Sequence, residues 1–495
     1  MELLSFLSST FFNLLIISAS LLYLLTSYFL RFKLKPWCKC ETCQSFLSAN
    51  WTSKFDNLPD WISHLLRFSP TQTIHIHILN NTITANPENV EHILKTNFEN
   101  YPKGSPFAAI LGDLLGRGIF VADGETWRFQ RKIASMELGS VSIRAYAYEI
   151  LASEIRTRLI PLLSNSAESG VIVDLQDVFR RFSFDNICQF SFGIDPGYLQ
   201  LSLPMSEFTD AFDVASKLSA ERALTAAPWV WKLKRLLNWG SERKLKEAIG
   251  KINFLAEDII EKRKKMGFSM RKDLLSRFMS STIDDDKYLR DIVISFLLAG
   301  RDTVASALTV VFYLLSKNPG IKSKIREESD RIFGDCGDDQ VFPRFEQLKE
   351  LHYLHAALYE CLRLFPPIQI DSKYAKEDDI LPDGTLVKMG TKVSYHPYAM
   401  GRMERIWGPD CLRFKPERWL RDGVFQPENP YKYPVFQAGV RACLGKEIAL
   451  VIMKTVVISL IRKFDFLLAE PNRQLIFVPG LTATLRGGLP VLVKN

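Results

Sequence analysis

The chain has 495 residues, of which 47% are apolar and 12% aromatic, and its formal net charge is +8. This composition is that of a globular protein with a large core, and it excludes a disordered or fibrous chain. Eight cysteines are too sparse for the disulfide framework of a small secreted domain, so we expect reduced thiols facing the cytosol. The basic residues are spread along the chain without a nucleic-acid-binding motif, so the positive charge describes a surface and not a nucleic-acid site.

The amino end is predicted to be a single transmembrane helix. Residues 3–30 contain no charged side chain, and a helix of that length exceeds the roughly 20 residues that cross a bilayer core. Arg31, Lys33 and Lys35 follow at once, which should keep the rest of the chain cytosolic. A cleaved signal peptide is the alternative, but its apolar region is usually only about 7–15 residues long. We therefore expect an anchor over 1–30, a linker over 31–60 and a catalytic domain over 61–495.

Three cysteines, Cys38, Cys40 and Cys43, stand together in the linker. Structural zinc takes four protein ligands, and no matching second cluster follows nearby in the sequence. The pattern therefore favours free or lipidated thiols beside the membrane over a metal site. His75 and His77 follow in an alternating segment and are expected to share one face of a strand, without a third ligand.

The remaining periodicity predicts a mainly α fold with small β-sheets near both ends of the catalytic domain. Residues 73–87 alternate on both sides of Asn80 and Asn81, which indicates a β-hairpin. Helical spacing then dominates to about residue 364, interrupted by prolines. Residues 373–400 and 475–495 return to alternation with glycine turns, which indicates further short strands.

One long apolar helix is expected from Asp285 to Lys317. Inside it stand Gly300, which costs about 1 kcal/mol relative to alanine in a helix interior, and the charged Asp302. A buried carboxylate costs more unless something uses it, so this segment is a candidate functional site. The alternative is a plain kink at the glycine, with Thr303 bonded back to its own helix.

The segment FQAGVRACLGKEIAL, residues 436–450, places Cys443 between two glycines and just before an apolar helix. The amino end of that helix and its N–H donors favour a thiolate, which is a metal ligand. Glycines at 439 and 445 let the backbone approach a flat group, against which Phe436 can lie, while Arg441 can reach a carboxylate. A buried structural cysteine is the alternative, but it leaves the glycines and the arginine unexplained.

With these motifs the chain resembles the cytochrome P-450 family of haem-thiolate monooxygenases over essentially its whole length. The resemblance implies haem b as cofactor, with Cys443 as the fifth ligand of its iron. It implies that Trp127 and Arg131, in the W-x-x-x-R segment, join Arg441 at the haem propionates. It also implies that Ala299-Gly300-x-Asp302-Thr303 is the oxygen-activation motif, in which Gly300 leaves room for dioxygen while Asp302 and Thr303 relay protons.

The same resemblance assigns a structural role to a second motif. Glu360 and Arg363 stand three residues apart on one helix face, and Arg418 follows in a PERW segment. In the family these side chains form a buried network that supports the fold and does no chemistry. Truncating one member of such a network should cost several kcal/mol.

No nucleotide-binding fingerprint is present in the sequence, so electrons should come from another protein. The resemblance implies that this partner is an NADPH-dependent flavoprotein reductase in the endoplasmic reticulum membrane. Several stretches resemble the plant branch that oxidises the terminal carbon of fatty acids, and CKCETC with LPDWISHLL resembles members that act on jasmonoyl-isoleucine and its 12-hydroxy form. An apolar pocket suits either substrate. The candidate lining residues are Phe107, Ile119, Phe120, Phe296, Ala299, Ile370 and Leu481.

Three alternatives remain beside oxidation of a jasmonoyl conjugate. The first is a plain fatty-acid omega-hydroxylase, and the second is a haem-thiolate isomerase or dehydratase that needs no reductase. Asp302 and Thr303 argue against the second, because a peroxide rearrangement needs no proton relay. The third is a haem-binding carrier or sensor without turnover.

Overall fold

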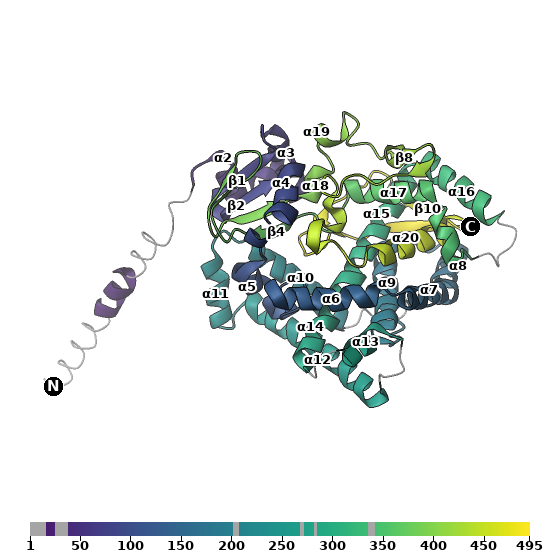
Figure 1. Cartoon of the computed structure of the whole chain (residues 1–495), viewed down its shortest axis with the longest axis horizontal. Coiled ribbons are helices and arrows are strands. Elements are labelled where there is room, and N and C mark those ends of the chain that lie inside the picture. The colour runs from purple at the N-terminus through teal and green to yellow at the C-terminus, as the bar shows by residue number, and fades with distance from the viewer. Residues whose placement is uncertain (1–15, 25–37, 201–206, 268–271, 282–284, 335–341) are drawn as a thin grey trace.

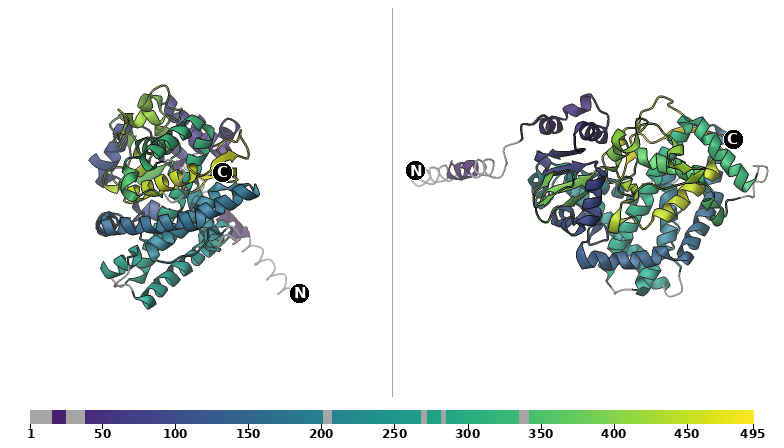
Figure 2. Two further views of the ribbon diagram at one scale, coloured as in Figure 1. Left: turned by 90° about the vertical axis from the view of Figure 1, so that its right-hand side faces the viewer. Right: turned by 45° about the horizontal axis from the view of Figure 1, so that its top comes forward.

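The protein is mainly helical, with small sheets set into the helical body (Figure 1). The computed structural model describes residues 16–24, 38–200, 207–267, 272–281, 285–334 and 342–495. The amino-terminal hairpin lies at one end of the body, and α16 (Pro319–Phe333) and β10 (Asp465–Leu468) lie at the other, as the views of Figure 1 and Figure 2 agree. The predicted combination of a mainly α fold with small sheets is confirmed.

Prolines begin several helices, as the sequence predicts. Pro228 and Pro319 are the first residues of α11 (Pro228–Leu236) and α16, where the missing N–H costs no hydrogen bond. Pro161 lies in the first turn of α8 (Ile160–Ser169). The other helices outside residues 286–317 are α2 (Glu41–Ser48), α3 (Leu58–Phe68), α4 (Pro87–Glu91), α5 (Gly104–Leu115), α6 (Gly124–Gly139), α7 (Val141–Glu154), α9 (Leu175–Phe192), α10 (Glu207–Leu224), α12 (Ser241–Met266), α13 (Leu274–Ser281), α17 (His352–Leu364), α18 (Pro397–Met400), α19 (Glu404–Trp407) and α20 (Lys446–Ile461).

The largest sheet joins segments from opposite parts of the chain. Its order is β1-β2-β7-β4, and β2 pairs in parallel with β7, so that Thr82 stands beside Val393. A second sheet has the order β10-β13-β3, and the remaining strands form three antiparallel pairs. The strands are β1 (Thr73–Ile76), β2 (Asn81–Thr84), β3 (Val173–Asp174), β4 (Asp371–Tyr374), β5 (Asp379–Ile380), β6 (Leu386–Val387), β7 (Lys392–Tyr395), β8 (Leu420–Arg421), β9 (Val424–Phe425), β11 (Phe477–Val478), β12 (Thr484–Leu485) and β13 (Pro490–Lys494).

The predicted hairpin forms, but its turn differs from the prediction. β1 and β2 pair with Thr73 opposite Thr84, and a 3-10 turn over His77–Leu79 connects them. Asn80 closes this turn in the left-handed region, with φ 45°, which asparagine tolerates better than most residues. His77 therefore lies in the turn and not in the strand beside His75. The two imidazole rings still lie side by side, with centroids 4.8 Å apart, but only His75 belongs to the strand, which ends at Ile76.

The predicted long helix crosses the centre of the body. It consists of α14 (Asp286–Leu297), a wider π-helical turn over Leu298–Asp302, and α15 (Thr303–Lys317). Among the described residues it is the one helix long and apolar enough to cross a membrane, but most of it is buried inside the protein. It is therefore a core helix, and α15 packs against α9, α17 and α20 in the largest apolar cluster.

The expected membrane anchor lies largely outside the described residues. Residues 16–24 are helical and their side chains are exposed, and this short helix stands apart from the body in Figure 1. The described chain resumes at Cys38 and enters α2.

Candidate active site

The loop around Cys443 connects a pair of short 3-10 turns to α20. The turns span Pro434–Phe436 and Gly439–Arg441, and the backbone N–H of Cys443 donates to the carbonyl of Phe436 at 2.7 Å. The backbone N–H groups of Gly445 and Lys446, at the start of α20, donate to the sulfur. The thiol is thus held at the amino end of a helix, as the sequence predicts.

Gly439 brings this loop against a turn from the amino-terminal part of the chain. Its φ of +62° lies in the left-handed region, and a Cβ at this position would overlap the carbonyl oxygen of Leu94. Both observations require glycine here. The structure therefore gives Gly439 a packing role of its own. Gly445 differs, because a Cβ there would touch the sulfur of Cys443 at an ordinary contact distance of 4.0 Å.

Burial and hydrogen bonding act on the thiol in opposite directions. Burial raises the pKa of Cys443, while the N–H groups of Gly445 and Lys446 and the positive charge of Arg131 lower it; burial wins. The N–H donors at the start of α20 thus act on the thiol in the expected direction, but burial outweighs them. A coordinated metal ion deprotonates its thiol ligand outright, so a bound cation supplies the missing stabilisation.

The thiol of Cys443 is accessible although protein atoms surround it. Cys443 is exposed, unlike the other described cysteines, yet burial is the strongest influence on its pKa. The aromatic ring of Phe436 belongs to the same loop and is half-buried.

Three of the predicted cofactor-binding residues, Trp127, Arg131 and Arg441, lie close together beside the loop. Trp127 and Arg131 belong to α6, and Arg131 donates to the carbonyl of Ala442, next to Cys443. The guanidinium of Arg441 stacks over the ring of Trp127 at 4.4 Å and donates to the carboxylate of Asp123 at 2.6 Å. Burial lowers the pKa of both arginines.

Sequence reasoning missed two lysines in the same region. Lys103 pairs with Asp371 at 2.6 Å, and Lys373, on β4, approaches the same carboxylate at 3.4 Å. Burial lowers the pKa of Lys373 well below its ordinary value, and the positive charge of Arg441 lowers it further. Burial raises the pKa of Asp371, but the two lysines more than reverse this and leave it below its usual range.

The charges of this region fit an anionic cofactor. Arg441 pairs with Asp123 and Lys103 pairs with Asp371, whereas Arg131 donates to a backbone carbonyl, so among the described residues of this region positive charge is in excess. Buried cations need compensating anions. The two propionates of haem meet this need, while Cys443 offers the soft sulfur ligand that iron takes. The residues present therefore fit haem.

The π-helical turn places the predicted catalytic residues at the junction of α14 and α15. The hydroxyl of Thr303 donates to the carbonyl of Ala299 at 2.5 Å, across the turn. This is the bond that the simple kink interpretation expects, so it does not by itself indicate catalysis. The hydroxyl oxygen can still accept a hydrogen bond from a proton donor.

Asp302 is buried next to the side chain of Arg301. The two lie 3.4 Å apart, and Arg301 also donates to Asp213 of α10 at 3.0 Å. Burial raises the pKa of Asp302, and Arg301 opposes this without reversing it. One carboxylate oxygen of Asp302 accepts no hydrogen bond from the described residues, so it remains able to take a proton or a water molecule.

Gly300 has a packing role in addition to the one that the resemblance implies. A Cβ on Gly300 would overlap the side chain of Ile187, on α9. The glycine therefore permits close packing of α9 against the π-helical turn. Its role beside dioxygen stays a prediction.

Glu360, Arg363 and Arg418 lie in one buried network, as the resemblance implies. Arg363 forms two bonds of 2.7 Å with the carboxylate of Glu360, and Arg418 approaches it at 3.4 Å. The indole of Trp419 and the backbone N–H of Lys415 also donate to Glu360, at 2.9 Å and 3.0 Å. Every oxygen of this buried carboxylate is therefore paired.

The candidate pocket residues differ in how deeply they are buried. Phe107, Ile119, Phe296 and Leu481 pack half-buried against one apolar cluster formed by α5, α12 and α14 among others. Phe120 and Ile370 are 38% and 36% exposed. Ala299, in the π-helical turn, presents its carbonyl to Thr303.

Comparison with known proteins agrees with the fold and the cysteine loop. The family model described as Cytochrome P450 matches residues 51–487, which is most of the chain. The chain therefore belongs to the cytochrome P450 family, whose members are haem-thiolate monooxygenases that bind haem and receive electrons from NADPH through a partner reductase.

Individual relatives narrow the similarity. The chain is 59% identical to cytochrome P450 94C1 of Arabidopsis thaliana over 464 residues, which is 93% of this chain and 94% of that protein. It is 48% identical to cytochrome P450 94B1 of the same plant, over 88% of this chain and 87% of that one. It is 42% identical to cytochrome P450 94A1 of Vicia sativa, over 88% and 86%.

Proposed function

We propose that the protein hydroxylates the terminal carbon of a fatty-acyl substrate, with haem bound through Cys443. The observation that carries this proposal is the position of that thiol, which is accessible at the amino end of α20 and lies close to Arg131, with Arg441 on the same loop. Haem held there supplies the activation of dioxygen for insertion into a C–H bond.

The reaction balances with the electron donor that the family uses. One oxygen atom of dioxygen enters the terminal C–H bond as a hydroxyl group, and the other leaves as water. NADPH supplies the two electrons through the reductase, together with one proton, and solvent supplies the second proton. Two further rounds convert the alcohol through the aldehyde to a carboxylate.

The cofactor-binding side chains have distinct proposed tasks. Arg131, Arg441 and Trp127 orient the propionates, and Arg131 also holds the carbonyl of Ala442 so that the loop keeps its position. Lys373 adds buried positive charge on the same side. This set fixes the cofactor in one orientation relative to the sulfur of Cys443.

Thr303 and Asp302 move protons in this proposal. The hydroxyl of Thr303 is already oriented by its bond to the carbonyl of Ala299, so its oxygen can hold a water molecule in a defined place. Asp302 is a buried carboxylate whose pKa burial raises, and one of its oxygens accepts no hydrogen bond from the described residues, which suits it to hold a proton.

The substrate class rests on the apolar side chains and on the branch resemblance. Phe107, Ile119, Phe120, Phe296 and Leu481 offer only hydrocarbon surface, with Ala299 and Ile370 as the two remaining candidates, so they suit an alkyl chain. Within that class we propose 12-hydroxy-jasmonoyl-isoleucine, oxidised to its 12-carboxy form in jasmonate catabolism, with dodecanoate as the representative plain fatty acid. Both present a terminal carbon at the end of an apolar segment.

The cellular location is proposed from the amino end. The uncharged run of residues 3–30 with its basic flank suits a single-pass anchor in the endoplasmic reticulum membrane, with the body in the cytosol. A reductase in the same membrane would then be within reach of the catalytic domain.

The test of the haem-thiolate site begins with a reduced carbon-monoxide difference spectrum of the purified protein. The wild type should give the thiolate-ligated spectrum, and Cys443→Ser should lose it. The wild type should then oxidise dodecanoate or 12-hydroxy-jasmonoyl-isoleucine only when NADPH and reductase are both present. Turnover without them would instead support an isomerase or dehydratase, and an intact spectrum without any turnover would support a carrier.

The proton relay is tested separately with Thr303→Ala and its conservative partner Thr303→Ser. The alanine variant should consume NADPH at a comparable rate but form less product and release more peroxide. The serine variant retains the hydroxyl and should recover most of the coupling. Equal coupling in the two variants would remove Thr303 from the mechanism.

A further inference from the structure

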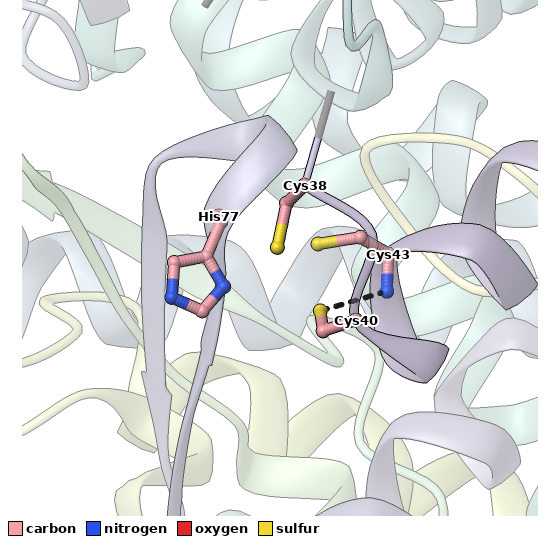
Figure 3. Close-up of side chains that lie close together, drawn as sticks. All are labelled: Cys38, Cys40, Cys43 and His77. Carbon is pink, nitrogen blue, oxygen red and sulfur yellow. Dashed lines mark hydrogen bonds between the residues drawn. The ribbon is translucent and has the colours of Figure 1, made fainter. Parts of the chain in front are cut away.

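A second cluster of ligand-type side chains lies far from Cys443, where the described body begins. Cys38, Cys40, Cys43 and His77 point toward one another, as Figure 3 shows. Their sulfur and ring nitrogen atoms all lie within 4.8 Å of one another. Cys43 is buried, Cys38 and Cys40 are half-buried, and His77 is exposed at the edge of the group.

Two local structures bring these residues together. Cys40 caps α2, and its sulfur accepts a hydrogen bond from the backbone N–H of Cys43 at 3.4 Å, so both thiols project from the first turn of that helix. His77 comes from the 3-10 turn that ends β1, more than thirty residues further along the chain. The imidazole of His77 lies beside the three cysteines in Figure 3.

The sequence argument against a metal therefore fails on its own terms. That argument required a fourth ligand, and none follows the three cysteines nearby in the sequence. The structure supplies it from the hairpin turn. Three thiolates and one imidazole are a complete ligand set for a structural zinc ion, which is almost always four-coordinate and tetrahedral.

We propose that Cys38, Cys40, Cys43 and His77 bind one Zn²⁺ ion as a structural site. Zinc–sulfur bonds are about 2.3 Å and zinc–nitrogen bonds about 2.0–2.1 Å, so ligand atoms in a tetrahedral site lie roughly 3.5–3.8 Å apart. The observed upper separation of 4.8 Å exceeds this by about an ångström, which rotation of the cysteine and histidine side chains can close.

Competing fates of the three thiols explain less of the arrangement. A disulfide would join two of them, leave the third unpaired and give His77 no role; the three are free, and the body faces a reducing compartment if the anchor is oriented as proposed. Lipidation needs an accessible sulfur, whereas Cys43 is fully buried and packs with Trp61 and Ile76. Only a shared ligand uses all four side chains.

The zinc ion would tie the first described segment of the body to the sheet. Residues 38–48 contribute three ligands and the β1–β2 turn contributes one, so the site would fix the direction in which the chain leaves the body toward its amino end. This role is independent of haem binding, because the site shares no residue with the loop of Cys443.

The experiment measures zinc in the purified full-length enzyme. Inductively coupled plasma mass spectrometry on protein prepared without chelators should find one zinc per chain, beside one haem iron. X-ray absorption at the zinc edge, where haem iron does not contribute, should show three sulfur ligands and one nitrogen ligand. Neither measurement requires a variant to fold.

Variants then assign the ligands. Cys40→Ser and His77→Ala should each weaken zinc binding and lower the zinc content. The loss of affinity should exceed the roughly 10- to 100-fold loss that follows removal of an outer hydrogen-bond partner at a metal site. The matched control is His75→Ala, since its ring lies only 4.8 Å from that of His77 but bonds to Thr82. His75→Ala should keep its zinc, and all three variants should keep the carbon-monoxide spectrum.

Three results would overturn the zinc site. The first is a wild type without stoichiometric zinc even after growth and purification with added zinc. The second is a disulfide between any two of the three cysteines, found by mass spectrometry of the non-reduced protein. The third is full zinc retention in the double variant that carries both Cys40→Ser and His77→Ala. Loss of the haem spectrum from the wild type would contradict the proposed function and leave the zinc result interpretable.

Discussion

Replacing Arg363 by lysine tests the buried network most directly, because it keeps the charge and removes the planar fork. The guanidinium donates to both oxygens of Glu360 and to the backbone carbonyls of Gly401, Cys411 and Arg413. An ammonium has three donors, so at least two of these five acceptors must lose their partner.

The expected cost follows from those orphaned acceptors. A buried acceptor left without a partner costs about 1–3 kcal/mol, so two give about 2–6 kcal/mol. Glu360 would still accept hydrogen bonds from the indole of Trp419 and the backbone N–H of Lys415, and Arg418 lies nearby. The expected loss of unfolding free energy is therefore in the lower half of this range, at about 2–4 kcal/mol. If unfolding breaks this network in its slow step, irreversible inactivation should be about 30- to 800-fold faster.

The assay follows the carbon-monoxide difference signal during incubation at a fixed temperature. The matched control is Arg243→Lys, because Arg243 pairs with Glu247 at 2.9 Å but both side chains are exposed. An exposed pair of this kind contributes under about 1 kcal/mol, so the control should decay at nearly the wild-type rate. Decay rates of Arg363→Lys and Arg243→Lys that agree within roughly twofold would refute the reasoning.

Two further predictions concern pH and packing. Burial raises the pKa of Glu154 to about 7, and an acid whose folded pKa lies above its ordinary value loses stabilisation as pH rises through that folded value. Glu154→Gln should therefore flatten the fall in melting temperature between about pH 5 and pH 8, whereas Glu149→Gln, at an exposed position on the same helix, should leave that fall unchanged. Gly300→Ala should lower the melting temperature because its Cβ overlaps Ile187, and adding Ile187→Ala should recover most of the loss; no recovery in the double variant would exclude this contact as the cause.

Local patterns were sufficient for the elements and for the cysteine loop. Alternation predicted the strands around Asn80 and in residues 373–400, although β2 is buried on both faces. Continuous apolar composition predicted the central helix, whereas its π-helical turn had been only the alternative interpretation of the glycine within it. These features depend on neighbours in the sequence, which the sequence displays directly.

Features that depend on distant neighbours were not accessible in the same way. Nothing near Gly300 in the sequence indicates that Ile187 lies against it, and nothing near Cys43 indicates that His77 turns toward it. The net pKa of Cys443 also depends on how deeply the finished fold buries it, which no local pattern reports. The lysine at position 373 gave only one weak signal, a charge within a predicted strand.

The parallel pairing of β2 with β7 has a consequence for synthesis of the chain. Thr84 pairs with Tyr395, about three hundred residues later in the chain. The outer edge of β2 therefore stays uncovered until β7 has been synthesised. At ribosomal rates of about 5–20 residues per second, the delay is roughly 15–60 s. During that interval the nascent chain displays an uncovered strand, a known template for intermolecular association, so chaperone occupancy on translating ribosomes should be greatest before β7 emerges.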